Sequence, residues 1–284
     1  IIDLRNNGGG SLYEAQALAN IFLGRGAVVQ IQNSSGNINS LGEVWGSRFY
    51  KKPLAILVNK FSASASEILA GVVKDYDRGI VVGTQTFGKG TVQRVSKLSL
   101  GQIKFTDSKF YRVSGSSTQN KGVTPHITLP SSVDIEEFGE SKLPWALDHD
   151  NITATSHRNF KETKRYLRYL QENNKERILN SQFYKNLNLK KDWGDRQNKK
   201  FITLNLSKRE QQKIIAEEEI LAIENSLRLS IGLETYSTYQ EFLDRDEDID
   251  EINIDKIELN ETAEILIDLI EANKKLEITS AIAA

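Results

Sequence analysis

The feature that most restricts the fold of this chain is a pair of apolar runs joined by a helical segment. Residues 53–58 (PLAILV) form an unbroken apolar run, as a strand covered on both faces would. Apolar side chains then repeat at helical spacing over 67–76, and a second apolar run follows at 79–83. Strands that alternate with helices in this way predict an α/β architecture with crossover connections.

The same kind of pattern continues on both sides of this unit. Residues 1–10 predict a strand that ends in three glycines, and residues 11–22 predict a helix. Further short strands are expected at 27–32, 91–95, 103–106, 110–113 and 127–129, with a polar loop at 33–46. Charged stretches of helical period follow at 161–180, 207–230 and 261–275.

Charge divides the chain into two parts of opposite sign. Residues 1–132 carry 15 Lys and Arg against 7 Asp and Glu, whereas the remainder carries 22 against 31. This asymmetry indicates two domains. We therefore expect a core domain at 1–132, a linker at 133–150 and a helical domain at 151–284. The basic residues of the first part form no run, so nucleic-acid binding is not expected.

Composition removes several classes of chemistry. The sequence has no cysteine, which excludes disulfides, thiolate metal sites and cysteine nucleophiles. It has no pair of histidines at ligand spacing, so we expect neither a metal nor another cofactor. No run of 18 apolar residues is present, so no transmembrane helix is expected. Because the chain opens with Ile inside a strand-like run, we expect it to be the C-terminal part of a longer protein.

The turn after the first apolar run offers a candidate nucleophile. Ser64 lies in the motif FSASASE, between two alanines and at a predicted helix start. This position leaves its hydroxyl uncrowded, and the N–H of Ala65 would point to where an oxyanion develops. The letters SASE also form a capping box, so Ser64 could simply cap the helix. Ser62 and Ser66 are rival nucleophiles on chemistry alone.

The turn after the second apolar run offers a candidate base. A serine nucleophile needs a base, and none of the three histidines lies in a recognisable motif with Ser64. Lys89 lies in a glycine-flanked turn and can act as a base when it is neutral; the alternative is an ordinary turn lysine. The segment 83–89 also matches the phosphate-loop pattern GxxxxGK. Gly90 replaces the hydroxyl residue that would hold Mg²⁺, so nucleotide hydrolysis is not expected.

Four motifs in one order are similar to a known family. They are DLRNNGGG (3–10), FSASASEI (61–68), VGTQTFGKGTVQ (82–93) and FYRVSGSSTQNKGVTP (110–125). Together they resemble the carboxy-terminal processing proteases of peptidase family S41, most closely the tail-specific branch. The resemblance implies part of a crotonase- or ClpP-like α/β Ser–Lys protease core, followed by a mostly helical C-terminal domain. The chain departs from the family at His126, where members usually have Asp, a difference that concerns a structural contact rather than the dyad.

The resemblance assigns roles to individual residues. It makes Ser64 the nucleophile, Lys89 its general base and Gln93 the residue that orients the lysine amine. The backbone N–H groups of Gly10 and Ala65 would form the oxyanion hole. It implies a serine endopeptidase without a cofactor that cleaves proteins selected by their C-terminal tails, in the periplasm or cell envelope.

The resemblance also implies partners, and two alternative functions stay open beside it. A PDZ domain in the part of the protein that precedes this chain would receive substrate tails, and an adaptor protein is a candidate partner. The first alternative is a catalytically inactive scaffold that presents its acidic helical half to a partner. The second is a crotonase-like acyl-CoA enzyme, which would have no use for Lys89.

Overall fold

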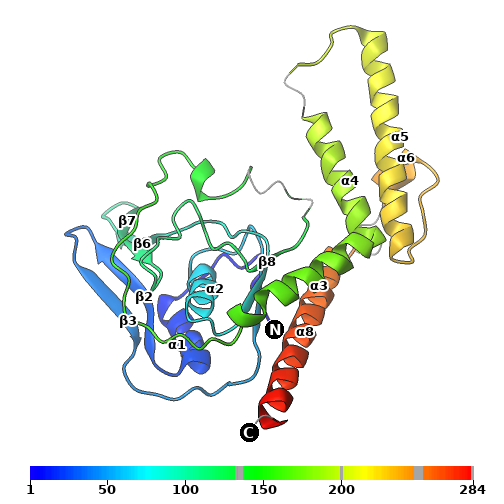
Figure 1. The fold of residues 1–284 in the computed structure, drawn as a ribbon. Helices are drawn as coiled ribbons and strands as arrows, with labels where there is room; N and C mark the ends of the chain where they lie inside the picture. The colour runs from blue at the N-terminus through cyan, green and yellow to red at the C-terminus, as the bar shows by residue number, and fades with distance from the viewer. Residues whose placement is uncertain (132, 134–136, 199–200, 246–251, 283–284) are drawn as a thin grey trace. The chain divides into compact units, whose positions relative to one another are not determined.

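The computed structural model describes residues 1–131, 133, 137–198, 201–245 and 252–282. Contacts divide the chain into two compact units, coloured along the sequence in Figure 1. The first unit takes its described residues from 1–129, 135–171 and 259–284, and the second from 130–134 and 172–258. Among the helices of the described part, none is both long enough and apolar enough to cross a membrane.

A parallel sheet forms the centre of the first unit. Its strands are β1 (Ile2–Asp3), β4 (Ala55–Val58), β5 (Ile80–Gly83) and β8 (Ile127–Thr128), in the order β1-β4-β5-β8. Ile56 of β4 lies between Ile2 and Val81 of its two neighbours. Every residue of β4 and β5 is buried, which confirms that the apolar runs at 53–58 and 79–83 are strands covered on both faces.

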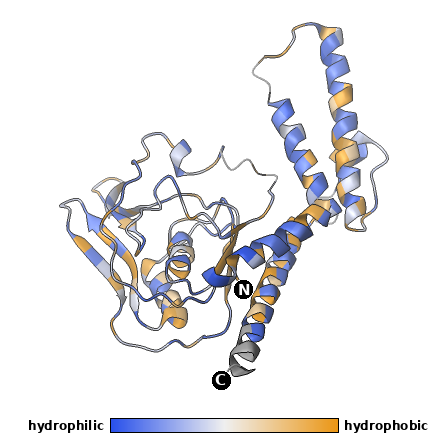
Figure 2. Cartoon of the chain, viewed as in Figure 1, coloured by the Kyte–Doolittle hydropathy of each residue, from blue (hydrophilic) through white to orange (hydrophobic). Residues whose placement is uncertain are grey.

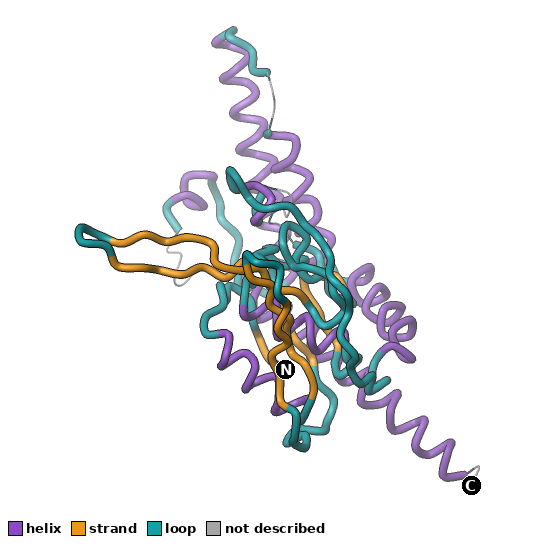
Figure 3. The backbone as a smooth tube through the Cα atoms, turned by 90° about the vertical axis from the view of Figure 1, so that its left-hand side faces the viewer, coloured by secondary structure: helices purple, strands orange, loops and turns teal. Residues whose placement is uncertain are grey.

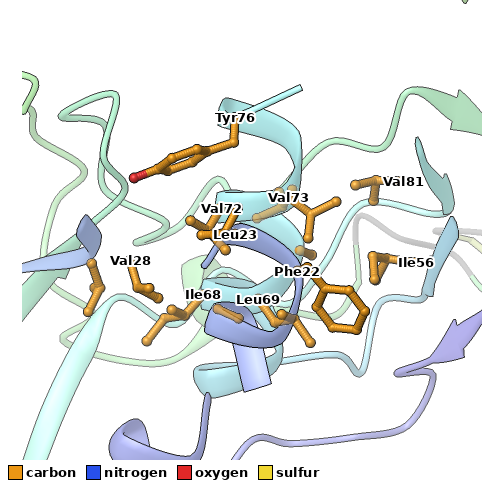
Figure 4. Close-up of a cluster of buried hydrophobic side chains, with 14 of the residues drawn as sticks. Phe22, Leu23, Val28, Ile56, Ile68, Leu69, Val72, Val73, Tyr76 and Val81 are labelled. Carbon is orange, nitrogen blue, oxygen red and sulfur yellow. The ribbon is translucent and has the colours of Figure 1, made fainter. Parts of the chain in front are cut away.

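Helices cover one face of this sheet. The helices α1 (Leu12–Leu23) and α2 (Ala65–Asp75) contact each other there. Side chains from both pack against Ile56 and Val81 of the strands, as Figure 4 shows for the cluster around α2. The predicted strand–helix–strand unit is therefore confirmed, and its helix packs its apolar stripe against the sheet.

Two C-terminal helices cover the opposite face. Leu170 of α3 (Leu167–Asn180) and Ile265 of α8 (Ile254–Ile282) cluster with Ala55 and Leu57 of β4. Because alternate residues of a strand point to opposite faces, the unbroken apolar run of β4 serves both layers. Parts of two predicted C-terminal helical stretches thus complete the core of the first unit.

A second, antiparallel sheet contains β3 (Ile38–Glu43), β2 (Gly26–Asn33), β7 (Gln102–Tyr111) and β6 (Thr91–Lys97), in the order β3-β2-β7-β6. Strands β6 and β7 form a long hairpin, drawn in orange in Figure 3.

Two expectations in this sheet are wrong. The predicted loop at 33–46 contains β3. This strand lies at the edge of the sheet and is polar and largely exposed, so its sequence lacks the apolar residues that indicate a strand. The strands predicted at 103–106 and 110–113 are one strand, because the polar residues between them pair with β6.

The segment that follows the sheets returns to the core. The N–H of Phe160 donates to the carbonyl of Tyr76 (2.8 Å), and Glu162 forms an ion pair with the fully buried Arg78 (2.9 Å). The short helix η2 (Lys164–Tyr166) comes next. Residues from the expected helical domain therefore pack in the first unit, and the domain boundaries at 132 and 150 stay a prediction.

The second unit is helical in its described part. The helices α4 (Gln182–Gln197) and α5 (Leu206–Ser230) lie side by side (Figure 1) and α6 (Tyr239–Leu243) contacts α5. Phe183, Leu187 and Leu227 form its core. Hydrophilic residues predominate along α4 and α5, with hydrophobic ones interspersed (Figure 2). The helices predicted at 161–180, 207–230 and 261–275 are confirmed as α3, α5 and α8, whereas α4 was not predicted because its sequence is mainly polar.

Candidate active site

The glycine-rich loop after β1 packs against the segment 59–64, which joins β4 to α2, carries Ser64 and is called the serine turn. The carbonyl of Asn7 accepts hydrogen bonds from the N–H of Ala63 (3.0 Å) and the hydroxyl of Ser66 (3.0 Å). The hydroxyl of Ser62 donates to the carbonyl of Leu4 (2.7 Å). Two of the three candidate nucleophiles are therefore held by backbone carbonyls, and both are buried. This arrangement favours Ser64 over Ser62 and Ser66.

The backbone of Ser64 has an unusual conformation. Its φ of +57° and ψ of −114° lie outside the regions that an L-residue adopts without strain. Ser11, at the start of α1, has the extended backbone that is usual for a helix cap, and its side chain accepts from the N–H of Glu14 (3.3 Å). Ser64 is the N-cap of α2 and forms the predicted capping box with Glu67, yet it lies on a strained strand-to-helix turn. This is the geometry that presents a serine nucleophile in GxSxG enzymes.

Gly9 packs closely against the backbone of this turn. A Cβ at Gly9 would lie 2.6 Å from the carbonyl oxygen of Ala63 and 2.7 Å from the backbone nitrogen of Ala65. Gly9 also has a φ of +93°. Only glycine can adopt this backbone and leave room for the Ser64 turn. A Cβ at the neighbouring Gly10, by contrast, would meet no atom within 4 Å.

Glu67 joins the serine turn to residues 88–90, which carry Lys89 and are called the lysine turn. One carboxylate oxygen accepts from the hydroxyl of Thr86 (2.6 Å) and the N–H of Gly88 (2.8 Å). The other accepts from the N–H groups of Ser64 (2.8 Å) and Lys89 (2.9 Å). Sequence reasoning assigned Glu67 only to a capping box and missed its link to Lys89. A carboxylate on the buried face of a predicted helix was the available signal.

The environment of Glu67 perturbs its ionisation. Its side chain is fully buried, and this burial raises its pKa from 4.5 to about 7, although the four hydrogen bonds act in the opposite direction. A carboxyl group of this kind titrates near neutral pH. The carboxyl group that connects the two turns therefore changes its charge in that pH range.

One pocket brings the predicted site residues together. A cavity of about 260 Å³ is lined by Gly10, Ser64, Ala65, Lys89 and Gln93. Its described lining also includes apolar and polar side chains that were not predicted, namely Leu12, Ile68, Thr91, Val92, Lys104 and Phe110.

Lys89 and Gln93 reach this pocket although the β6–β7 register shifts between residues 92 and 93. No acidic residue or histidine is among the described residues that line it. The chemical roles of the five predicted residues stay a prediction.

The histidines have other surroundings. The Nδ1 of His126 accepts from the N–H of Val81 in β5 (3.0 Å), and burial, with a contribution from nearby Lys74, lowers its pKa to about 4. His126 thus makes a structural contact with β5, at the position where the chain departs from the family motif. His157 packs against the ring of Tyr76.

Two family models match the chain. Residues 1–129 match peptidase family S41, and residues 133–271 match the C-terminal domain of tail specific protease. Residues 1–129 of the chain belong to peptidase family S41.

Curated proteases are similar in sequence to this chain. The tail-specific protease of Haemophilus influenzae is 39% identical over 225 residues, which cover 75% of this chain and 32% of that protein. The carboxy-terminal-processing protease of Bartonella bacilliformis is 38% identical over 131 residues, which cover 45% of this chain and 30% of that protein. The solved structure of a photosystem II D1 C-terminal processing protease is 37% identical and covers 48% of this chain and 36% of its own, with a TM-score of 0.40. The chain spans about a third of the length of these curated relatives.

Proposed function

We propose that the protein carrying this chain is a serine endopeptidase in which Ser64 is the nucleophile and Lys89 the general base. The observation that carries the proposal is the pocket where the serine turn, the lysine turn and Gly10 converge. No histidine or carboxylate is among the described residues around that pocket, whereas two lysines, Lys89 and Lys104, are. The family motif favours Lys89, which lies in the glycine-flanked turn. Membership of family S41 supports the same reaction class.

The reaction follows from these positions. Neutral Lys89 takes the hydroxyl proton as Oγ of Ser64 attacks the scissile carbonyl. The N–H groups of Gly10 and Ala65 stabilise the negative oxygen, and the N-terminus of α2 adds a favourable dipole. Protonated Lys89 then gives its proton to the leaving amine. A water molecule that loses a proton to Lys89 then attacks the acyl-enzyme. The bond between the acyl carbon and Oγ of Ser64 breaks, and Lys89 returns the proton to Oγ. Gln93 orients the lysine amine.

The proposal includes the choice of substrate and the location. We propose protein substrates selected by their C-terminal tails, as the name of the Haemophilus relative suggests for that protein. The apolar side chains of Leu12, Ile68, Val92 and Phe110 suit an apolar substrate residue beside the scissile bond. A location in the periplasm or cell envelope, a PDZ domain elsewhere in the protein and an adaptor partner belong to the same proposal.

The test compares variants of the full-length protein on a model substrate with an apolar C-terminal tail. We expect Ser64→Ala to abolish cleavage and Lys89→Ala to reduce kcat by about 10²- to 10⁴-fold, with little change in the thermal midpoint. Ser35→Ala and Lys97→Ala, at exposed positions outside the pocket, are the matched controls. Turnover at the wild-type rate in Lys89→Ala would refute the dyad.

A second measurement separates the peptidase from an inactive scaffold. A fluorophosphonate probe reacts with an activated serine, so we expect it to label the wild-type protein at Ser64 and to leave Ser64→Ala unlabelled. If the intact protein is not labelled and cleaves nothing, the scaffold is the better description. Binding of an acyl-CoA in the pocket would instead favour the crotonase-like enzyme.

A further inference from the structure

The backbone of the lysine turn is bonded on both of its sides. Glu67 accepts the N–H groups of Gly88 and Lys89 from one side, as described above. On the other side lies the segment 117–120, with the sequence STQN. The proposed reaction assigns no role to this segment. Three bonds join this segment to the turn: Asn120 N–H donates to Gly88 O (2.8 Å), Thr118 Oγ1 to Lys89 O (3.1 Å) and Gly90 N–H to Gln119 Oε1 (2.8 Å). A further bond from outside the segment runs from Phe110 N–H to Gly90 O (2.9 Å).

Gln119 is the centre of the second side. Its side chain is fully buried, and its backbone N–H donates to the hydroxyl of Ser117 (3.0 Å). The contact with the turn is close, because a Cβ at Gly90 would lie 2.6 Å from the backbone nitrogen of Gln119. The amide oxygen of Gln119 therefore fixes the position of Gly90, the residue directly after Lys89.

Glu140 fixes the orientation of this amide. The Nε2 of Gln119 donates to Oε1 of Glu140 (3.3 Å). Glu140 begins the short helix η1 (Glu140–Lys142), and its own N–H donates to the carbonyl of Phe87 (3.1 Å). Because a carboxylate cannot donate when ionised, the amide of Gln119 must turn its NH₂ group toward Glu140 and its oxygen toward Gly90.

We propose that Gln119 and Glu140 act as a positioning relay that holds the Lys89 turn in the geometry required for catalysis. The inference rests on the role of Lys89 proposed above. Glycines on both sides give this turn more conformational freedom than other residues would, so the constraint must come from outside it. A catalytic group that is misplaced by about 1 Å can cost on the order of 10²-fold in rate. Since Glu140 lies beyond residues 1–129, the following region completes the site.

The test exchanges the two polar groups in the full-length protein. Gln119→Leu removes both bonds, and Gln119→Glu places a second carboxylate against Glu140. We expect each to lower kcat by about 10- to 100-fold with KM unchanged. The double variant Gln119→Glu with Glu140→Gln re-forms both bonds, because the new carboxylate accepts from Gly90 N–H and from the new amide. We expect its kcat to return to within about threefold of the wild type.

The readouts separate positioning from folding. Folded protein is quantified by circular dichroism and by the thermal midpoint, so that kcat refers to folded enzyme. Gln85→Leu is the matched control, since the Gln85 amide donates to the exposed carbonyl of Lys121 (2.5 Å) and not to the lysine turn. We expect it to retain wild-type kcat.

Two results would overturn the relay while leaving the dyad intact. They are a wild-type kcat per folded protein in Gln119→Leu while Lys89→Ala shows its expected loss, or a double variant no faster than Gln119→Glu alone. Full activity of Lys89→Ala would overturn the dyad and the relay together.

Discussion

Glu67 is predicted to make the fold less stable as the pH rises toward neutral. Burial raises the pKa of this carboxyl from 4.5 to about 7, so the folded protein binds its proton more tightly than the unfolded chain does. The stabilisation is complete below pH 4.5 and is lost as the pH passes through about 7. A difference of this size in pKa corresponds to roughly 3 kcal/mol at 25 °C. The sign is opposite to that of an ordinary paired carboxylate.

The perturbation that isolates this effect is Glu67→Gln. Glutamine cannot ionise, so the variant lacks the pH dependence that Glu67 contributes. We expect the free energy of unfolding of the wild type, minus that of the variant, to fall by roughly 3 kcal/mol between pH 4.5 and pH 8. Urea unfolding of both proteins at several pH values measures it, in a Ser64→Ala background that prevents self-digestion. The other titrating groups cancel in the difference.

The direction of the difference decides whether this reasoning is correct. If the wild type gains stability relative to Glu67→Gln as the pH rises, the four hydrogen bonds outweigh burial and the pKa of Glu67 is lowered instead. Parallel curves would mean that Glu67 does not titrate between pH 4.5 and pH 8. Glu14→Gln, at an exposed position of α1, is the control for loss of a carboxylate near a helix start.

Two further predictions concern the serine turn. Gly9→Ala should reduce kcat by about 10²-fold, because the added Cβ would meet the backbone of Ala63 and Ala65, whereas Gly8→Ala, which meets nothing within 4 Å, should not; steady-state kinetics of both variants checks this. Ser64→Gly should be more stable than Ser64→Ala by about 1–2 kcal/mol, because glycine relieves the strain of a φ of +57°. Equal urea midpoints for these two inactive proteins would show that the turn stores no strain.

Some features escaped sequence analysis because their local signal is weak. The strand β3 and the helix α4 have mainly polar sequences. In α4, Phe183, Tyr184 and Leu187 recur at helical spacing, and this short apolar stripe was the signal that was missed. The polar residues in the middle of β7 likewise predicted two strands, but their pairing with β6 makes β7 one continuous strand. The contact of His126 with β5 was not predicted, because it joins residues far apart in sequence.

Local sequence patterns were sufficient to locate the elements that carry the site. Apolar runs and helical periods located β4, α2 and β5, and the small-residue motifs placed Ser64 and Lys89 in the turns that follow the two strands. These are local properties, because the period of the side chains along the chain decides which face each element buries.

The way these turns are joined became visible only in the folded chain. Ser64 and Lys89 share a pocket with Gly10, and Glu67 binds the N–H groups of both turns. The strained backbone of Ser64 and the contact between Gln119 and Glu140 also appear only in the folded chain. The physical reason is that these contacts connect residues far apart in sequence, where neither periodicity nor spacing carries information about distance in space.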